Sequence, residues 1–180
     1  MLTPRVNESP DTSPDRMRKN TINLRVWLSI PDAEAVTVKN TLVRRMGFQD
    51  VLADVKKERL FSIEVDSGNP EEMAKNFVKE LVNENKESCK VLFDELKFEQ
   101  GYVPVKVALH IEDGEAISTR ERLRNRLGFK NVVDVKKATI WKLYIKGKNQ
   151  ERIAKEIAEG LLINPHKDSY EILAKAKITA

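Results

Sequence analysis

The sequence contains few of the residues that build catalytic or metal sites. Its 180 residues include one cysteine, Cys89, and two histidines, His110 and His166. A lone cysteine excludes an internal disulfide, and neither histidine has a second ligand residue at metal-binding spacing. Cys89 has no nearby base, so we expect a buried or half-exposed thiol and not a nucleophile. The sequence therefore predicts no catalytic residue, no bound cofactor and no metal.

Long apolar runs are also missing. No stretch approaches the roughly 20 apolar residues that span a bilayer. Residues 1–20 lack the apolar segment typical of a secretory signal. The phosphate-binding pattern G-x-x-x-x-G-K-[ST] does not occur. We expect a cytoplasmic protein that has no membrane association and no nucleotide site of this kind.

Charged residues are plentiful but unevenly distributed. The chain has a formal net charge of +4, yet residues 21–100 carry −3 and residues 101–180 carry +6. Such an asymmetry bears on the binding partners of a protein and not on its fold. We expect the two halves to present different surfaces.

The two halves of the chain also repeat one another. At an offset of 81, nine residues between Val26 and Val51 recur between Val107 and Val132. The tetrapeptide Asp-Val-Lys-Lys then recurs at an offset of 80. A single one-residue shift over this length indicates a tandem duplication. The expected divisions are a disordered tail at 1–20, a first unit at 21–98 and a second unit at 103–178.

Each unit shows the same order of predicted elements: a strand, a helix, two strands joined by a turn, a second helix and a last strand. The first and last strands are expected at 22–30 and 89–97 in one unit, and at 103–111 and 169–176 in the other. The fold class is therefore α+β, with two βαββαβ units. Each unit would be an antiparallel four-stranded sheet with two helices on one face, and the two would pack as a pseudo-dimer.

Polar residues and glycines mark the ends of the predicted helices. The expected N-caps are Asp32, Asn69, Asp113 and Asn149. Gly47 and Gly128 are expected to end the first helix of each unit, because glycine readily adopts the left-handed conformation. In the closing stretch "GLLINPHKDSYEI" (160–172), Asn164 would end the last helix in that same conformation. Pro165 would follow because it cannot continue a helix.

These residues carry a resemblance to a known family. The second unit opens with a Val-x-Val-x-Leu strand and has Leu-Gly-Phe after its first helix. It closes on Asn-Pro followed by a tyrosine, and in this pattern it resembles the PurS family. The residues that carry the signature are Gly47, Phe48, Gly128, Phe129, Asn164, Pro165 and Tyr170. The first unit matches more weakly, since it lacks Asn-Pro, and both units lack the family's Asp-Pro-Gln-Gly loop and Gly-Lys turn.

The resemblance implies a role in de novo purine biosynthesis. PurS proteins are non-catalytic small subunits of phosphoribosylformylglycinamidine synthase, an ATP-dependent ligase. Their dimers join the synthetase PurL to the glutaminase PurQ, so that ammonia from glutamine reaches the nucleotide. The implied partners are PurL-like and PurQ-like subunits, with ATP and Mg held by the synthetase. The two units would correspond to a fused dimer, which could associate further with itself.

Basic residues are the candidates for a partner interface. The candidate residues are Lys56, Lys57, Lys136, Lys137, Arg120 and Arg124. The two lysine pairs are expected near the turn between the second and third strands of each unit, where family members carry basic residues. The two arginines are expected on one helix face. A purely solvated role remains open for both groups.

Two other functions fit the same element order. An RNA-binding protein would stack bases on strand aromatics such as Trp27, Phe61, Trp141 and Tyr144. However, the sequence lacks the aromatic motif of such domains, which disfavours nucleic acid as a partner. A tandem of ACT-like ligand-sensing domains would need a glycine-rich turn after the first strand, and neither unit has one.

Overall fold

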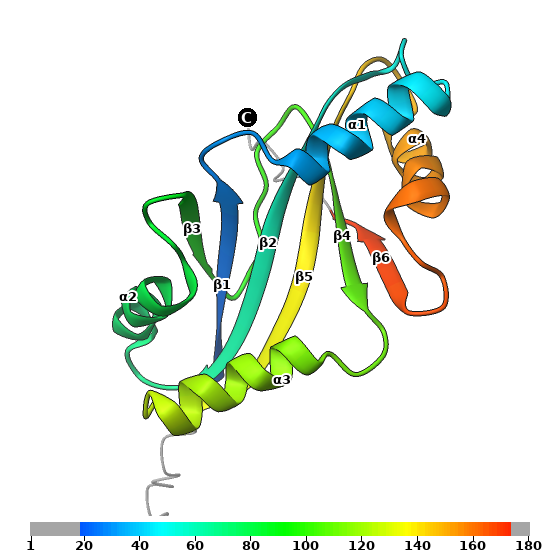
Figure 1. Cartoon of the computed structure of the whole chain (residues 1–180). Helices are drawn as coiled ribbons and strands as arrows, with labels where there is room; N and C mark the ends of the chain where they lie inside the picture. The colour runs from blue at the N-terminus through cyan, green and yellow to red at the C-terminus, as the bar shows by residue number, and fades with distance from the viewer. Residues whose placement is uncertain (1–18, 174–180) are drawn as a thin grey trace, which may run out of the picture.

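The computed structural model describes residues 19–173, in which six antiparallel strands form one sheet and four helices cover one of its faces (Figure 1). The strand order across the sheet is β3-β1-β2-β5-β4-β6. The strands are β1 (Lys19–Leu28), β2 (Leu52–Asp66), β3 (Glu87–Phe93), β4 (Val103–Leu109), β5 (Val132–Ile145) and β6 (Asp168–Ile172). The helices are α1 (Ala33–Arg45), α2 (Pro70–Leu81), α3 (Gly114–Glu121) and α4 (Gln150–Ile157), with π-helical extensions η1 (Arg122–Arg126) after α3 and η2 (Ala158–Leu162) after α4.

The two halves follow the same order of elements, strand-helix-strand-helix-strand. Each half contributes three neighbouring strands to the sheet, and the long strands β2 and β5 pair with each other at its centre. The α+β class is confirmed for the described residues. The predicted tail falls mostly outside them, although β1 already begins at Lys19.

The expectation of four strands in each half was wrong. A single continuous strand, β2 or β5, replaces the predicted second and third strands in both halves. The lysine pairs at 56–57 and 136–137 therefore lie in mid-strand and not near a turn. No glycine, proline or asparagine stands at these points to make a tight turn. Each long strand instead hydrogen-bonds to the other over nearly its whole length.

Most of the predicted helix ends are confirmed. The carboxylates of Asp32 and Asp113 accept hydrogen bonds from the backbone amides two and three residues further on, at 2.9–3.2 Å. Gly47 and Gly128 have φ values of +81° and +79°, so they adopt the left-handed conformation expected after a helix.

The second helix of each half begins differently from its counterpart. Asn69 caps α2 as predicted, and its side chain accepts a hydrogen bond from the amide of Glu72. Asn149 occupies the N-cap position of α4, as predicted, but its side chain does not cap the helix. Asn149 is itself left-handed, with φ of 60°, and makes no side-chain capping bond. An N-cap residue normally has an extended backbone that directs its side chain toward the first amides of the helix.

Both main hydrophobic cores combine residues of the two halves. The first lies between α1, α4 and the sheet, and includes Leu42 of the first half and Leu143 and Ile157 of the second. The other lies below α2 and α3, and brings Phe77 together with Leu123, both fully buried. The two halves are therefore interleaved and are not two bodies that pack through a shared surface.

A third, smaller core lies on the sheet face opposite the helices. The connecting segment (residues 94–102) joins the halves and runs across this face. Its Phe98 and Tyr102 are buried against Leu60 of β2 and Ile140 of β5. Part of the second sheet face is thus covered by the chain itself.

The turn that precedes β6 differs from the predicted helix ending. Asn164 does not have positive φ; its side-chain oxygen accepts a hydrogen bond from the amide of His166, at 3.0 Å. Its own amide donates to the carboxylate of Asp168, at 2.7 Å. Asn83 makes the same two kinds of bond before β3, with Asn85 and Glu87. The first half therefore keeps this turn although it lacks Asn-Pro.

We expect Asn164→Ala to lower the free energy of unfolding by about 1 kcal/mol, because the amide of His166 then loses its acceptor. Pro165→Ala, in the same turn, is the matched control and should cost about half as much, through chain entropy alone. Urea denaturation measures both. A greater loss for Pro165→Ala than for Asn164→Ala would contradict this account of the turn.

Candidate functional site at the centre of the sheet

Two equivalent ion pairs occupy the helix-covered face at the sheet centre. Lys57 of β2 pairs with Glu34 of α1, and Lys137 of β5 pairs with Glu115 of α3. The hydrogen bond from Lys137 lowers the pKa of the Glu115 carboxyl below its usual value. Each pair ties the first turn of a helix to a long strand, where an acidic residue also suits the helix dipole.

These pairs border a hollow of about 730 Å³ that lies beside the first of the two main cores. Arg59 and Trp141 also line it, and Arg59 pairs with Glu87 of β3 at 2.6 Å. Every cation here that comes from the long strands, at positions 57, 59 and 137, already has a carboxylate partner. The hollow therefore offers no free positive charge to an anionic ligand.

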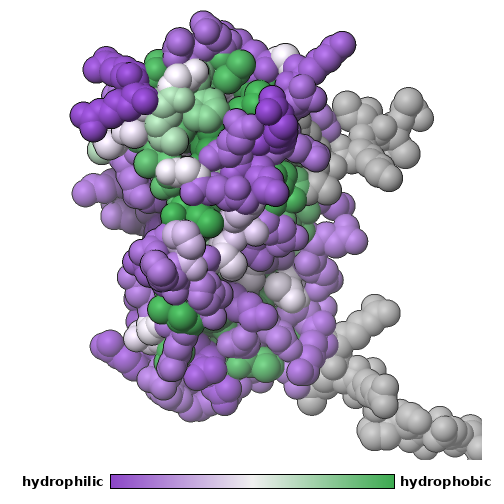
Figure 2. Space-filling model, turned by 90° about the vertical axis from the view of Figure 1, so that its right-hand side faces the viewer, coloured by the Kyte–Doolittle hydropathy of each residue, from purple (hydrophilic) through white to green (hydrophobic). Residues whose placement is uncertain are grey.

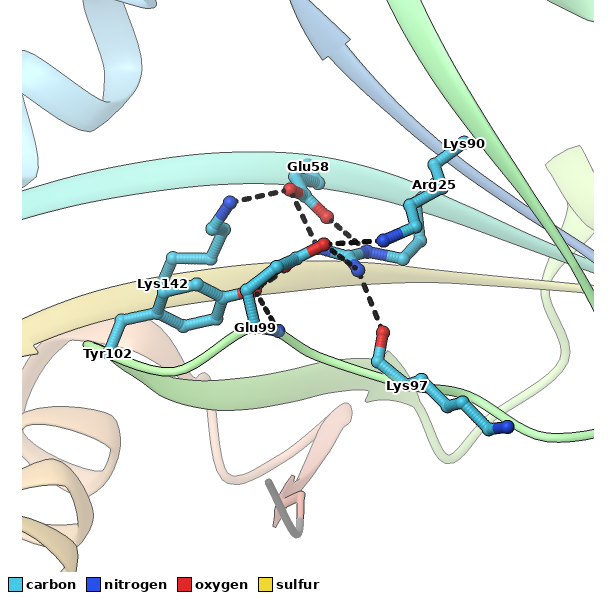
Figure 3. Close-up of polar contacts among 7 residues, drawn as sticks. All are labelled: Arg25, Glu58, Lys90, Lys97, Glu99, Tyr102 and Lys142. Atoms are coloured by element: carbon cyan, nitrogen blue, oxygen red, sulfur yellow. Dashed lines mark hydrogen bonds and ion pairs between the residues drawn. The ribbon is translucent and has the colours of Figure 1, made fainter. Parts of the chain in front are cut away.

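A denser polar cluster lies on the opposite face of the sheet (Figure 3). Arg25 of β1 is 1% exposed and makes a two-pronged bond with Glu58 of β2, at 2.7 and 3.1 Å. Lys142 of β5 also binds Glu58, at 3.0 Å. From the connecting segment, Glu99 and the Tyr102 hydroxyl contact the same guanidinium at 3.2 and 3.3 Å.

This cluster joins all three parts of the chain. Arg25 and Glu58 belong to the first half, Lys142 to the second and Glu99 to the connecting segment, and their side chains converge on one point in Figure 3. Arg25 also donates to the carbonyl of Lys97, at 2.8 Å, and its guanidinium lies over the Phe98 ring. A buried charge must be paired and hydrogen-bonded to be tolerated, and here each charge is. The cluster is well suited to fixing the connecting segment on the sheet.

The ionisation of Glu99 and Tyr102 is coupled to this cluster. Partial burial would raise the pKa of Glu99, but hydrogen bonds from Lys90, Tyr102 and Arg25 hold it well below the usual range. Burial and the hydrogen bond to Glu99 raise the pKa of the Tyr102 hydroxyl. The charged carboxylate and the neutral phenol are therefore the forms that hold the segment in place.

The pH dependence of stability should report the Glu99 contacts. A carboxyl whose pKa is lowered by folding stabilises the folded state above its unfolded pKa, about 4.3, and loses this contribution as the pH falls below it. We therefore expect Glu99→Gln to be less stable than the wild type at pH 7, with a difference that shrinks below pH 4. Urea denaturation across this pH range measures it. A difference that stays constant with pH would contradict the proposed role of the carboxylate.

Within residues 19–173, no group of histidine, cysteine and acidic residues could hold a metal ion. The pKa of the half-buried Cys89 is raised to about 11, first by burial and then by the nearby Glu87 carboxylate. The half-buried position is the one expected for this thiol, which stays protonated at neutral pH with such a pKa. No helix among these residues is long and apolar enough to cross a membrane.

The aromatic residues considered for base stacking do not form an open platform. Phe61 and Trp141 are 3% and 5% exposed and lie beneath the helices. Tyr144 faces the other side, where it packs against Tyr102 of the connecting segment. Trp27 of β1 is half-buried. None of these four residues is exposed, so they do not supply the stacking surface on which a sheet-type RNA-binding domain depends.

The structure separates the six basic residues proposed for a partner interface. Lys57 and Lys137 face the helices in the ion pairs described above, whereas Lys56 and Lys136 are exposed on the opposite face. Arg120 lies 3.8 Å from Asp134, and Arg124 is half-buried on η1. Their use by a partner stays a prediction, and of the six only Lys56 and Lys136 are exposed.

Sequence reasoning missed the Arg25 cluster. In "INLRVWLSI", Arg25 occupies a polar position of an alternating strand, which is the pattern of a solvent-exposed residue. Its burial depends on the connecting segment, whose path over the sheet leaves no signal in the periodicity of β1. The alternating pattern correctly placed Arg25 on the sheet face opposite the apolar residues of β1, but it did not reveal that the connecting segment covers this face.

Comparison with known proteins gives one match. Residues 102–176 match the family model described as PurS: Phosphoribosylformylglycinamidine (FGAM) synthase. This region runs from the start of β4 past the end of β6, so the match covers the second half of the chain. No curated protein matches the chain.

Proposed function

We propose that the protein is a non-catalytic assembly subunit of phosphoribosylformylglycinamidine synthase and acts in purine biosynthesis. The PurS match of residues 102–176 carries this proposal. A structural role is supported by the buried cluster of Arg25, Glu58 and Lys142, which holds the two halves of the chain together. ATP and Mg would belong to the synthetase partner, and the complex would work in the cytoplasm.

The first half corresponds, in this proposal, to a diverged copy of the PurS unit. The repeated order of elements supports it, as do the equivalent ion pairs Lys57–Glu34 and Lys137–Glu115. Two further pairs, Lys39–Asp54 and Arg120–Asp134, are related by the same offsets. A duplicated and fused chain can change one copy alone, which a homodimer cannot do.

Divergence of the halves gives a physical basis for bridging two different subunits. The net charges of −3 for residues 21–100 and +6 for residues 101–180 would favour partners of opposite charge at the two ends of the sheet. One half would contact a PurL-like synthetase and the other a PurQ-like glutaminase, so that ammonia passes between them.

Co-purification tests this function. The full chain is mixed with the PurL and PurQ subunits of the same organism, singly and together, and complexes are separated by size-exclusion chromatography. We expect one assembly that contains all three proteins, and glutamine-dependent synthase activity that falls when this chain is omitted. Activity that is equal with and without the chain, and no co-elution with either subunit, would refute the proposal.

A further inference from the structure

The sheet contains two openings where neighbouring strands part. Pairing of β4 with β5 stops at Val107 and Thr139, so residues 132–138 of β5 pair only with β2. Pairing of β1 with β2 stops at Val26 and Arg59, and the first part of β2 likewise pairs only with β5. Within residues 19–173, each opening leaves a strand edge without a neighbouring strand on one side. We call them the second notch, beside β5, and the first notch, beside β2.

The second notch is mainly apolar on one side and basic on the other, and among the described residues Asp113 is the one acidic residue in its lining. It is a hollow of about 310 Å³ bordered by Leu109, Ile111 and Ile117, and the first two of these are 38% and 53% exposed. Lys106 and Lys136 also line it, and neither forms an ion pair within residues 19–173. Hydrophobic residues reach the surface in several places on the side of the molecule that carries β6 and α4 (Figure 2).

The first notch is a larger hollow, about 720 Å³, but its carboxylates already form ion pairs within the chain. Glu58 binds Lys142 and Arg25 there, and Asp54 binds Lys39. Lys56 lies over the ring of Tyr144. In the second notch the residues equivalent to Glu58 and Lys142 are Ala138 and Ser62, so this internal network is absent. The two notches have equivalent strand pairing but are lined by different side chains.

An unpaired strand edge presents backbone N–H and C=O groups that another extended chain can bind. Side chains of an added strand alternate between the two faces of the sheet. At the second notch, one face offers Ile117 and Leu109 beside α3, and the other offers Lys106 and Lys136. The side chains of a complementary strand would therefore alternate between apolar and acidic.

We propose that the second notch binds an extended segment of a partner protein, in which apolar and acidic residues alternate, as an added strand along residues 133–138 of β5. The apolar side chains lie against Ile117 and Leu109, and the acidic ones face Lys106 and Lys136. This inference does not depend on the proposed function, because it rests on the edge of β5 and the lining of the notch alone.

A peptide probe tests the notch directly. The probe is the fluorescein-labelled hexapeptide Glu-Val-Glu-Val-Glu-Val, and its binding to the full-length protein is measured by fluorescence anisotropy. The matched control Glu-Glu-Glu-Val-Val-Val has the same composition without the alternation, and should bind about tenfold more weakly because only a strand can satisfy both faces. Equal binding of the two peptides would overturn the proposal and leave only nonspecific attraction to basic residues.

Hydrogen exchange then locates the bound peptide. We expect slower exchange at alternate amides within residues 133–138, with no change at residues 53–58 of the first notch. Protection confined to residues 53–58, or none in either stretch, would refute the assignment to β5.

Charge reversal provides the second measurement. Lys106→Glu combined with Lys136→Glu should weaken binding of the alternating peptide about tenfold, since two attractions become repulsions. Lys56→Glu is the matched control, because Lys56 is the equivalent of Lys136 in the first half, and it should leave binding unchanged. Thermal unfolding confirms that each variant is folded. An equal loss for Lys56→Glu would overturn the proposal.

Discussion

Arg25→Ala is expected to lower the free energy of unfolding by about 3 kcal/mol, because it leaves the buried Glu58 carboxylate without its two-pronged partner. Lys142 still neutralises part of that charge, which keeps the loss at the lower end of the range for a broken buried pair. Guanidinium denaturation measures the change. Arg44→Ala, at an exposed position of α1, is the control and should alter stability by less than about 0.5 kcal/mol.

A second variant separates the cost of the unpaired charge from that of lost packing. When both partners of a buried ion pair are replaced by apolar residues of similar size, much of the penalty disappears. The double variant Arg25→Leu with Glu58→Leu should therefore be more stable than Arg25→Ala alone. A double variant that is less stable than the single one would show that packing and hydrogen bonds to the connecting segment dominate at this position.

Separating the two halves should abolish folding altogether. Fragments 1–100 and 101–180, produced individually and kept dilute enough to stay monomeric, are expected to lack near-ultraviolet circular dichroism and a cooperative unfolding transition. Each main core takes residues from both halves, so either fragment alone would expose Leu42 or Leu123 to water. Small domains rarely tolerate the loss of half of a core.

Mixing the fragments is the control for this experiment. Equimolar fragments should recover the helical signal of the intact chain, because the missing half of each core is then supplied by the partner fragment. A single fragment that unfolds cooperatively as a monomer would contradict the interleaved cores. The measurement also bears on the fused-dimer proposal, since it shows whether the two units can still associate without a covalent link.

Local features of the fold could be predicted from the sequence, but the pairing of distant parts could not. Asp32 and Gly47 delimit α1, as their capping and conformational preferences require. The turn expected near Lys56-Lys57 was wrong. The alternation of apolar and polar residues is interrupted there, which suggested two strands, but no turn residue is present and β2 continues as one strand. Periodicity indicates which residues are buried, but it does not say whether they pack against their own half or the other.

The candidate site shows the same division between local and distant information. Basic residues were recognised, yet whether each is free or paired depends on acids that come from other elements. Lys137 of β5 forms an ion pair with Glu115 of α3. Lys136, its neighbour in sequence, is exposed and forms no ion pair within residues 19–173. Adjacent strand residues face opposite sides of a sheet, so two identical lysines have different roles.

The two halves contribute equivalent strands to the sheet, but the single connecting segment lies against only one set of equivalent residues. Its binding place on the sheet depends on Arg25 and Glu58, whose equivalents in the second half are Lys106 and Ala138. One segment can cover only one of two equivalent places, and among residues 19–173 no corresponding segment covers the other, next to β5. The two similar halves of the protein therefore present different surfaces on this face of the sheet. A partner that recognises the uncovered place would dock in a single copy and in one orientation, which fixes the stoichiometry and polarity of any larger assembly.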